Sequence, residues 1–214
     1  MKNLIGLKWT GDLSLQDADV LVHYGMQSRN ALEFGCGGST QLLAQVCLNV
    51  TSVETVPEWI DVVRKRLANI ENKRADVAFR SYTDEVEGMF DLIFVDGVKG
   101  RRLSFASRMW ERLHTGGIML FHDTRKDWGV ELIKQFVTVK FAEIGLIDIN
   151  AFASDGQQCN ITVIQKRQQS PYIFWQAVEN KPKWAYGSNV LREFIRAPQV
   201  KFLQDEGLFH LFHP

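Results

Sequence analysis

Apolar positions follow two alternating patterns along residues 14–166. Short apolar or β-branched runs predict strands at 31–34, 49–54, 76–80, 90–95, 118–121, 145–152 and 160–166. Between them, apolar residues at helical spacing predict helices at 14–24, 39–46, 55–68, 100–114 and 128–141. Strands that alternate with helices indicate an α/β fold, because a helix returns the chain to start the next parallel strand. The last two strands are joined by the turn Ser154-Asp155-Gly156 without a helix, which predicts an antiparallel hairpin.

The run Phe90 to Val95 has the pattern of a central strand. It is continuously apolar apart from Asp91, as expected for a parallel strand that is buried on both faces. Asp96 follows directly, so its side chain should emerge at the carboxyl end of that strand. Open α/β sheets bind their ligands at this edge, which makes Asp96 a candidate site residue.

The two ends of the chain lie outside this alternating pattern. Residues 1–28 are predicted to form an N-terminal cap, with a helix that starts at Ser14 in a capping box with Asp17. Residues 29–167 form the predicted core domain. Residues 168–214 are rich in aromatic residues, which favour burial over exposure to solvent. This C-terminal extension is expected to pack on the core, to form a lid, or to join two copies of the chain in a homo-oligomer, and the sequence leaves these open.

Composition excludes several classes of protein. Lys and Arg together number 25 and so do Asp and Glu, so the formal net charge of zero argues against a dedicated nucleic-acid binder. Cys36, Cys47 and Cys159 show no C-x-x-C spacing, so neither a disulfide framework nor a zinc cluster is expected. No apolar run is long enough to cross a membrane and no signal peptide is visible. We therefore predict a cytoplasmic protein without a membrane partner.

The stretch Ala31 to Thr40 carries the clearest chemistry. A short apolar run leads into the Gly-rich segment Gly35-Cys36-Gly37-Gly38, and a helix is predicted to follow from Ser39. Glycines let a ligand approach the backbone, and the free amides of a helix N-terminus favour a negative group. A dinucleotide fingerprint would need glycine or alanine where Thr40 stands, so that match is imperfect. Glu54 follows the next strand, in the position where an acid binds a ribose in nucleoside-binding folds.

The segment Glu33-Phe34-Gly35-Cys36-Gly37-Gly38-Ser39 resembles motif I of class I S-adenosylmethionine (SAM)-dependent methyltransferases. The strand that ends in Asp96 resembles motif IV, and Leu-x-x-Gly-Gly followed by a strand and His122-Asp123 is similar to the end of the family's fifth strand. Ser39 replaces the third glycine of many members, and Thr115 replaces the usual proline. The resemblance covers residues 31–166 and is nearest to small O-methyltransferase-like proteins. It implies a Rossmann-like doubly wound sheet, mostly parallel with a C-terminal antiparallel hairpin, in which residues 29–167 bind SAM.

The resemblance also implies a cofactor site. In this interpretation Glu54 accepts hydrogen bonds from both ribose hydroxyls, Tyr82 stacks on the adenine, and Ser81 or Asp84 bonds its amino group. The expected cofactor-binding residues are Glu33, Gly35, Cys36, Gly37, Ser39, Thr40, Glu54, Ser81, Tyr82 and Asp96.

The expected reaction is methyl transfer to a small-molecule acceptor, at oxygen. His122 is the predicted general base because an imidazole titrates near neutral pH. Asp123 would orient it, bind the acceptor or ligate a metal, and Asp96 completes the predicted catalytic set. No metal is the first expectation. If the reaction uses Mg²⁺, Asp96 and Asp123 are its predicted ligands, although Thr124 replaces the asparagine often found next.

Three further points stay open from the sequence. Arg101 and Arg102 could hold an anionic acceptor, but a solvent-facing helix start is the favoured interpretation. A SAM-binding protein without catalysis, or an NAD-dependent dehydrogenase on the same scaffold, are the alternative functions. Nucleic-acid methylation is disfavoured by the neutral charge and by the absence of an Asn-Pro-Pro-Tyr-like motif after Asp96.

Overall fold

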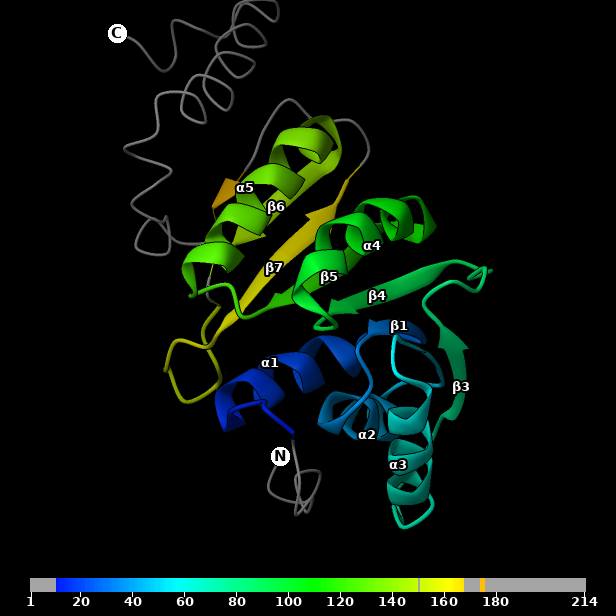
Figure 1. Cartoon of the computed structure of the whole chain (residues 1–214). Coiled ribbons are helices and arrows are strands. Elements are labelled where there is room, and N and C mark those ends of the chain that lie inside the picture. Colours follow the sequence, from blue (N-terminus) through cyan, green and yellow to red (C-terminus); the bar gives the residue numbers. More distant parts are fainter. Residues whose placement is uncertain (1–10, 150, 168–173, 176–214) are drawn as a thin grey trace, which may run out of the picture.

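The predicted strands form a single sheet. The computed structural model describes residues 11–149, 151–167 and 174–175. Within these residues eight strands hydrogen-bond in the order β3-β2-β1-β4-β5-β7-β6-β8 (Figure 1). Their bounds are β1 (Asn30–Phe34), β2 (Asn49–Glu54), β3 (Asp76–Ser81), β4 (Phe90–Val95), β5 (Leu113–His122), β6 (Ile144–Asp148), β7 (Ile161–Lys166) and β8 (Phe174–Trp175).

The strand order reverses between β1 and β4. The chain runs outward through β2 and β3, returns to β4 on the other side of β1, and continues to β5, with all of these pairs parallel. β7 then pairs antiparallel with both β5 and β6. The doubly wound, mostly parallel sheet with a C-terminal antiparallel hairpin is therefore confirmed. The reversal leaves a crevice at the carboxyl ends of β1 and β4, where this class of sheet binds its ligand.

Helices cover both faces of the sheet. One group lies on one face and the other group on the opposite face (Figure 1). The first group is α1 (Leu15–Gly25), α2 (Gly38–Val46) and α3 (Pro57–Leu67), and the second is α4 (Arg102–Met109) and α5 (Asp127–Lys140). Short 3₁₀ turns occur at η1 (Lys99–Arg101), η2 (Trp110–Arg112) and η3 (Phe141–Glu143).

The alternation of side chains along β4 explains the two core layers. Ile93 and Val95 pack in the layer that also holds Phe105 of α4, whereas Leu92 and Phe94 pack in the layer with Leu42 of α2. Successive strand residues point to opposite faces, so a strand covered on both sides must be apolar at every position. This is why the run from Phe90 to Val95 is apolar apart from Asp91, and Asp96 then follows at the carboxyl end of the strand.

Some predicted boundaries are wrong. The helix predicted to end at His114 ends at Met109, where η2 tightens the chain and brings Leu113 into register with Phe90 of β4. β5 therefore starts earlier than predicted, and its Gly-Gly pair lies inside the strand. The strand predicted to end at Phe152 ends at Asp148.

The N-terminal cap and the C-terminal extension are described only in part. The cap helix is α1, and the predicted capping box is confirmed because the amide of Asp17 donates to Ser14 Oγ and the amide of Ser14 donates to Asp17 Oδ2. Almost all of the aromatic extension 168–214 lies outside the described residues. No helix in the described part of the chain is long and apolar enough to cross a membrane.

Candidate cofactor and acceptor site

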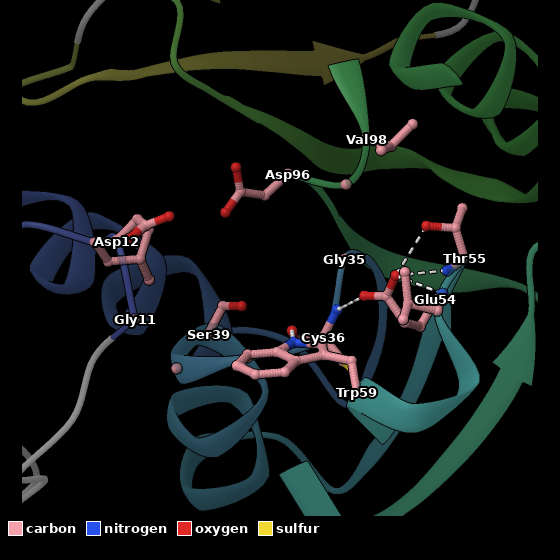
Figure 2. A pocket seen from close by; sticks show the side chains of 15 residues that line it. Gly11, Asp12, Gly35, Cys36, Ser39, Glu54, Thr55, Trp59, Asp96 and Val98 are labelled. Carbon is pink, nitrogen blue, oxygen red and sulfur yellow. Dashed lines mark hydrogen bonds between the residues drawn. The ribbon is translucent and has the colours of Figure 1, made fainter. Parts of the chain in front are cut away.

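Two adjoining cavities lie at the carboxyl ends of the central strands. The first has a volume of about 450 Å³. Figure 2 shows its lining, which comprises Gly11–Leu13, Gly35–Ser39, Glu54–Val56, Trp59 and Asp96–Val98. Of the ten residues predicted to bind the cofactor, Gly35, Cys36, Gly37, Ser39, Glu54 and Asp96 line this cavity.

The Gly-rich loop forms the floor of the first cavity. Gly35 has φ +94°, and a Cβ there would lie 2.7 Å from the backbone of Gly97, so this loop and the loop after β4 touch. α2 begins at Gly38, so its N-terminal amides face the cavity region. Burial and the charges of Glu33 and Glu54 raise the pKa of the Cys36 thiol, so the thiol stays protonated. Cys36 therefore contributes to the cavity through its backbone.

Glu33 supports the loop from below. It is fully buried, and its carboxylate accepts hydrogen bonds from Ser39 Oγ, from Thr40 Oγ1 at 2.6 Å and from Ser52 Oγ at 2.6 Å. Burial raises the pKa of Glu33 to about 7, against the three hydroxyl donors, which lower it. Glu33 and Thr40 do not line the cavity, so their prediction as direct ligands is not supported. They hold the loop in shape.

Glu54 joins the ends of β1 and β2. Its Oε1 accepts from the amides of Thr55 and Val56 at 2.5 and 3.1 Å, and its Oε2 accepts from the amide of Cys36 at 3.1 Å. A carboxylate offers about four acceptor positions, and Oε2 uses one of them for the amide of Cys36. The second oxygen thus has room for a ligand hydroxyl.

Three partly exposed apolar side chains also line this cavity. Val56, Trp59 and Val98 line it although each is at least one third exposed, at 49%, 36% and 51%. The indole of Trp59 is anchored because Nε1 donates to the carbonyl of Cys36 at 2.6 Å. The sequence interpretation missed these side chains. The available signal was an exposed tryptophan in the amphipathic helix that follows Glu54.

Ser81 and Tyr82 lie outside the lining. The Tyr82 ring packs against Phe34 and Phe105, with centroids 5.3 and 6.4 Å away, and its hydroxyl bonds Ser104 Oγ at 2.8 Å. The predicted stacking of Tyr82 on adenine is therefore not supported, because the core already holds the ring. Ser81 uses its amide to bind Asp84 within the same turn.

The second cavity has a volume of about 700 Å³ and is strongly polar. It contains the three predicted catalytic residues, and it shares Asp12 and Asp96 with the first cavity. The full lining is Asp12, Ser14, Gln16, Asp17, Asp96, Arg102, His122, Asp123, Arg125, Lys126, Gln158, Cys159 and Asn160. Figure 2 shows the carboxylates of Asp12 and Asp96 facing one another across the boundary.

His122 lies between two carboxylates. Its Nδ1 is 2.8 Å from Asp96 Oδ1 and its Nε2 is 3.4 Å from Asp17 Oδ2. Burial lowers the pKa of His122, but the hydrogen bonds to Asp17 and Asp96 outweigh it and raise the pKa to about 9. The imidazole is a cation at neutral pH with both nitrogens occupied. The structure thus argues against the predicted role of His122 as general base.

A pH-dependent stability is expected from this arrangement. The pKa of His122 in the folded protein is raised from 6.5 to about 9. Protonated His122 therefore stabilises the fold fully below pH 6.5, and this stabilisation is lost as the pH rises through about 9. The pKa shift corresponds to roughly 3 kcal/mol of the free energy of unfolding. In urea unfolding, wild type should have a higher free energy of unfolding than His122→Asn at neutral pH, and this difference should shrink above pH 9. A gap that stays constant or widens with pH would contradict the charged state.

Arg102 lies inside the site, contrary to the prediction of a solvent-facing helix start. It is 6% exposed, and Nε donates to Gly97 O at 2.6 Å while Nη1 donates to His122 O at 2.9 Å. Nη2 reaches Asp96 Oδ1 at 3.1 Å and Asp123 Oδ2 at 3.4 Å. One side chain of α4 therefore ties together the ends of β4 and β5. The prediction missed it because a run of arginines at a helix start usually faces solvent.

Asp123 occupies an unusual backbone position. Its φ is +64°, a left-handed conformation that non-glycine residues seldom adopt and that is often found at functional sites. Its Oδ1 accepts from Lys126 Nζ at 2.7 Å and from Asn160 Nδ2 at 3.2 Å. The neighbouring positive charges outweigh burial and lower the pKa of Asp123.

A family model described as a methyltransferase domain matches residues 32–124. The match runs from β1 through the Gly-rich loop and Asp96 to the segment just after His122. This part of the chain is therefore similar to a methyltransferase domain. The match supports SAM-dependent methyl transfer and favours neither the dehydrogenase nor the non-catalytic alternative.

Solved structures share the fold of this methyltransferase domain. An O-methyltransferase of Bacillus cereus in complex with SAH is 21% identical, with 77% of this chain and 86% of that chain covered and a TM-score of 0.56. The O-methyltransferase TomG of Streptomyces achromogenes in complex with SAM is 16% identical, with 73% and 83% covered and a TM-score of 0.58. The N-methyltransferase NodS of Bradyrhizobium japonicum in complex with SAH is 19% identical, with 71% and 86% covered and a TM-score of 0.52. A search of curated proteins found no match.

Proposed function

We propose that this methyltransferase binds SAM in the first cavity and transfers its methyl group to a small polar acceptor in the second. The observation that carries the proposal is that the two cavities meet at Asp12 and Asp96. The sulfonium of SAM is a cation, and two carboxylates that face one another at this boundary favour a positive centre there. We place the transferred methyl group at this boundary.

The lining of the first cavity matches the parts of SAM in order. The N-terminus of α2 at Gly37–Ser39 would bind the methionine carboxylate, because a helix N-terminus favours a negative group. Glu54 would accept a ribose hydroxyl through Oε2. Val56, Trp59 and Val98 would cover the adenine with apolar surface.

Oxygen is the proposed acceptor atom. The likeness to two O-methyltransferases supports it, although the N-methyltransferase NodS shares the same fold. The polar second cavity suits a hydrophilic molecule, and Arg125 and Lys126 give its rim positive charge. A small-molecule acceptor is proposed rather than a nucleic acid, in line with the net charge of zero.

Asp96 is the proposed proton acceptor. Both of its side-chain contacts, from His122 and Arg102, fall on Oδ1, so among the described residues Oδ2 makes no hydrogen bond. As the bond from the methyl carbon to sulfur breaks and the bond to the acceptor oxygen forms, the hydroxyl proton would pass to Oδ2 and SAH would remain. His122 and Arg102 would act as positioning residues that fix the other oxygen.

Calorimetric titration with SAM and SAH tests the cofactor site. Wild type should bind both ligands, and Glu54→Ala should weaken both by about tenfold or more, because the ribose and the loop at Cys36 each lose an acceptor. Glu58→Ala is the matched control, since Glu58 is exposed on α3 and lies outside the cavity lining. SAH release should then be screened over small hydroxyl and amine compounds. Folded wild type that binds neither ligand would overturn the proposal.

A further inference from the structure

Asp96, His122 and Asp123 form the one described group of acidic, cysteine and histidine side chains with the spacing of a metal site, and their ligand atoms lie within 4.8 Å of one another. The two carboxylates are also the ligands that the sequence predicts for Mg²⁺, if the reaction uses it. A divalent cation such as Mg²⁺ binds carboxylate oxygens at about 2.1 Å. The space between Asp96 Oδ1 and Asp123 Oδ2 is already taken by Nη2 of Arg102, at 3.1 and 3.4 Å. The residues present do not fit a bridging metal ion in this arrangement.

The guanidinium of Arg102 is held too firmly to move aside easily. Besides the two carboxylates, it donates to the carbonyls of Gly97 and His122, and its plane lies over the ring of Trp128 with its carbon 4.9 Å from the centroid. A buried arginine with this many partners is fixed by both loops that it joins. Displacing it would leave buried carbonyls without donors.

The negative charge of Asp123 is also balanced by a second cation, Lys126. Lys126 Nζ lies 2.7 Å from Asp123 Oδ1, on the oxygen that Arg102 does not contact. Each oxygen of Asp123 therefore faces a positive charge. A divalent cation would meet these charges at short range, which weakens its binding strongly in a partly buried site.

We propose that Arg102 takes the place of a divalent cation in this site and that methyl transfer is independent of metal. Arginine is permanently charged, so it keeps one positive charge between the two carboxylates at every relevant pH and holds Asp96 through Oδ1, which leaves Oδ2 to the acceptor. A guanidinium fixed in this way cannot chelate two acceptor oxygens. Given the proposed function, the acceptor is then presented through a single hydroxyl or amine and needs no adjacent pair of oxygens.

Binding of Mn²⁺, followed by electron paramagnetic resonance on SAH-saturated protein, tests this assignment. Wild type should leave Mn²⁺ free up to about 1 mM. Arg102→Met removes the positive charge and should create a Mn²⁺ site at Asp96 and Asp123, with affinity at least about tenfold above that of wild type. Arg102→Lys restores the charge and should abolish the gain. Arg101→Met is the matched control, because Arg101 lies over the ring of Tyr82 and should change nothing.

Two results would overturn the assignment. One is tight Mn²⁺ binding by wild type that is lost in Asp123→Asn. The other is a folded, SAH-binding Arg102→Met protein that gains no Mn²⁺ site. If Arg102→Met does not fold, the wild-type titration and Arg102→Lys decide the question. SAH affinity is measured in the same samples, so a failure of the proposed cofactor site is recognised separately from a failure of the metal assignment.

Discussion

Gly35→Ala is expected to abolish measurable SAM and SAH binding and to lower the free energy of unfolding by about 3 kcal/mol. Gly35 adopts φ +94°, where an alanine is strained, and its new Cβ would lie 2.7 Å from Cα and N of Gly97. Both atoms belong to backbone, so a side-chain rotation cannot relieve the contact. The loops that carry Cys36 and Asp96 would have to separate, and these loops form the floor and one wall of the first cavity. Urea unfolding and calorimetry measure the two effects.

Gly100→Ala is the control for this prediction. Gly100 lies in η1, close to the same loop after β4, but a Cβ there meets nothing within 4 Å and its φ is not positive. Its stability and SAH affinity should match wild type within about 0.5 kcal/mol. A Gly35→Ala protein that binds SAH as well as Gly100→Ala does would show that the two loops need not touch for cofactor binding.

The strand and helix pattern was predictable because it depends on neighbours in sequence. The apolar run of β4, the glycines after β1 and the Ser14–Asp17 capping box each show their structure within a few residues. The predicted boundaries of helices and strands were wrong where pairing with a residue far away in the sequence sets the end of an element. The helix α4 ends early because Leu113 of β5 pairs with Phe90 of β4, and no pattern in the neighbouring sequence predicts that pairing.

The predicted backbone positions lie at the first cavity, whereas some of the predicted side chains do not. The glycines and Glu54 line the cavity, since their position follows from the strand ends. Glu33 was placed correctly in the sheet, but its register with Ser52 of β2 turns its carboxylate into the hydroxyl cluster under the loop. Tyr82 lies on the expected loop, yet its ring packs against Phe34 and Phe105.

The acceptor side depends on contacts between residues far apart in the chain. Asp17 of α1 accepts from the amide of Asn160 at 2.6 Å, and Asp19 accepts from the amide of Ser154 at 2.6 Å, so α1 is held against the β6–β7 connection. This docking places Asp12 at the boundary of the two cavities. The sequence contains no short-range sign of it. The same holds for the partners of Arg102.

The docking of α1 also explains why His122 could not be judged from sequence. A histidine at the end of a strand is a reasonable base when its environment is unknown. Here Asp17 reaches its Nε2 from α1 while Asp96 reaches its Nδ1 from the end of β4. Two acids from different elements convert a candidate base into a buried cation. In the proposed mechanism the proton passes instead to Oδ2 of Asp96, which makes no hydrogen bond among the described residues.

Asp96→Asn should reduce the methyl-transfer rate by about 10²- to 10⁴-fold while SAH affinity stays within about threefold. The substitution removes the proposed proton acceptor and keeps the shape of the side chain and a hydrogen-bonding oxygen for Arg102. The residual rate of the variant should rise with pH, because hydroxide can then ionise the acceptor in place of Asp96. Initial rates of SAH release across pH, with an acceptor identified by screening, measure both effects.

Asp123→Asn is the matched comparison, because Asp123 also bonds Arg102 but lines only the second cavity. It removes one negative charge from the same cluster and should lower the rate by no more than about tenfold, without the rise of the rate with pH. Equal losses in the two variants would mean that the charge of the cluster, and not a proton acceptor at the cavity boundary, supports catalysis. A full rate in Asp96→Asn would exclude Asp96 as the base. A much larger loss in Asp96→Asn, with the pH response confined to it, would identify Oδ2 of Asp96 as the atom that receives the proton.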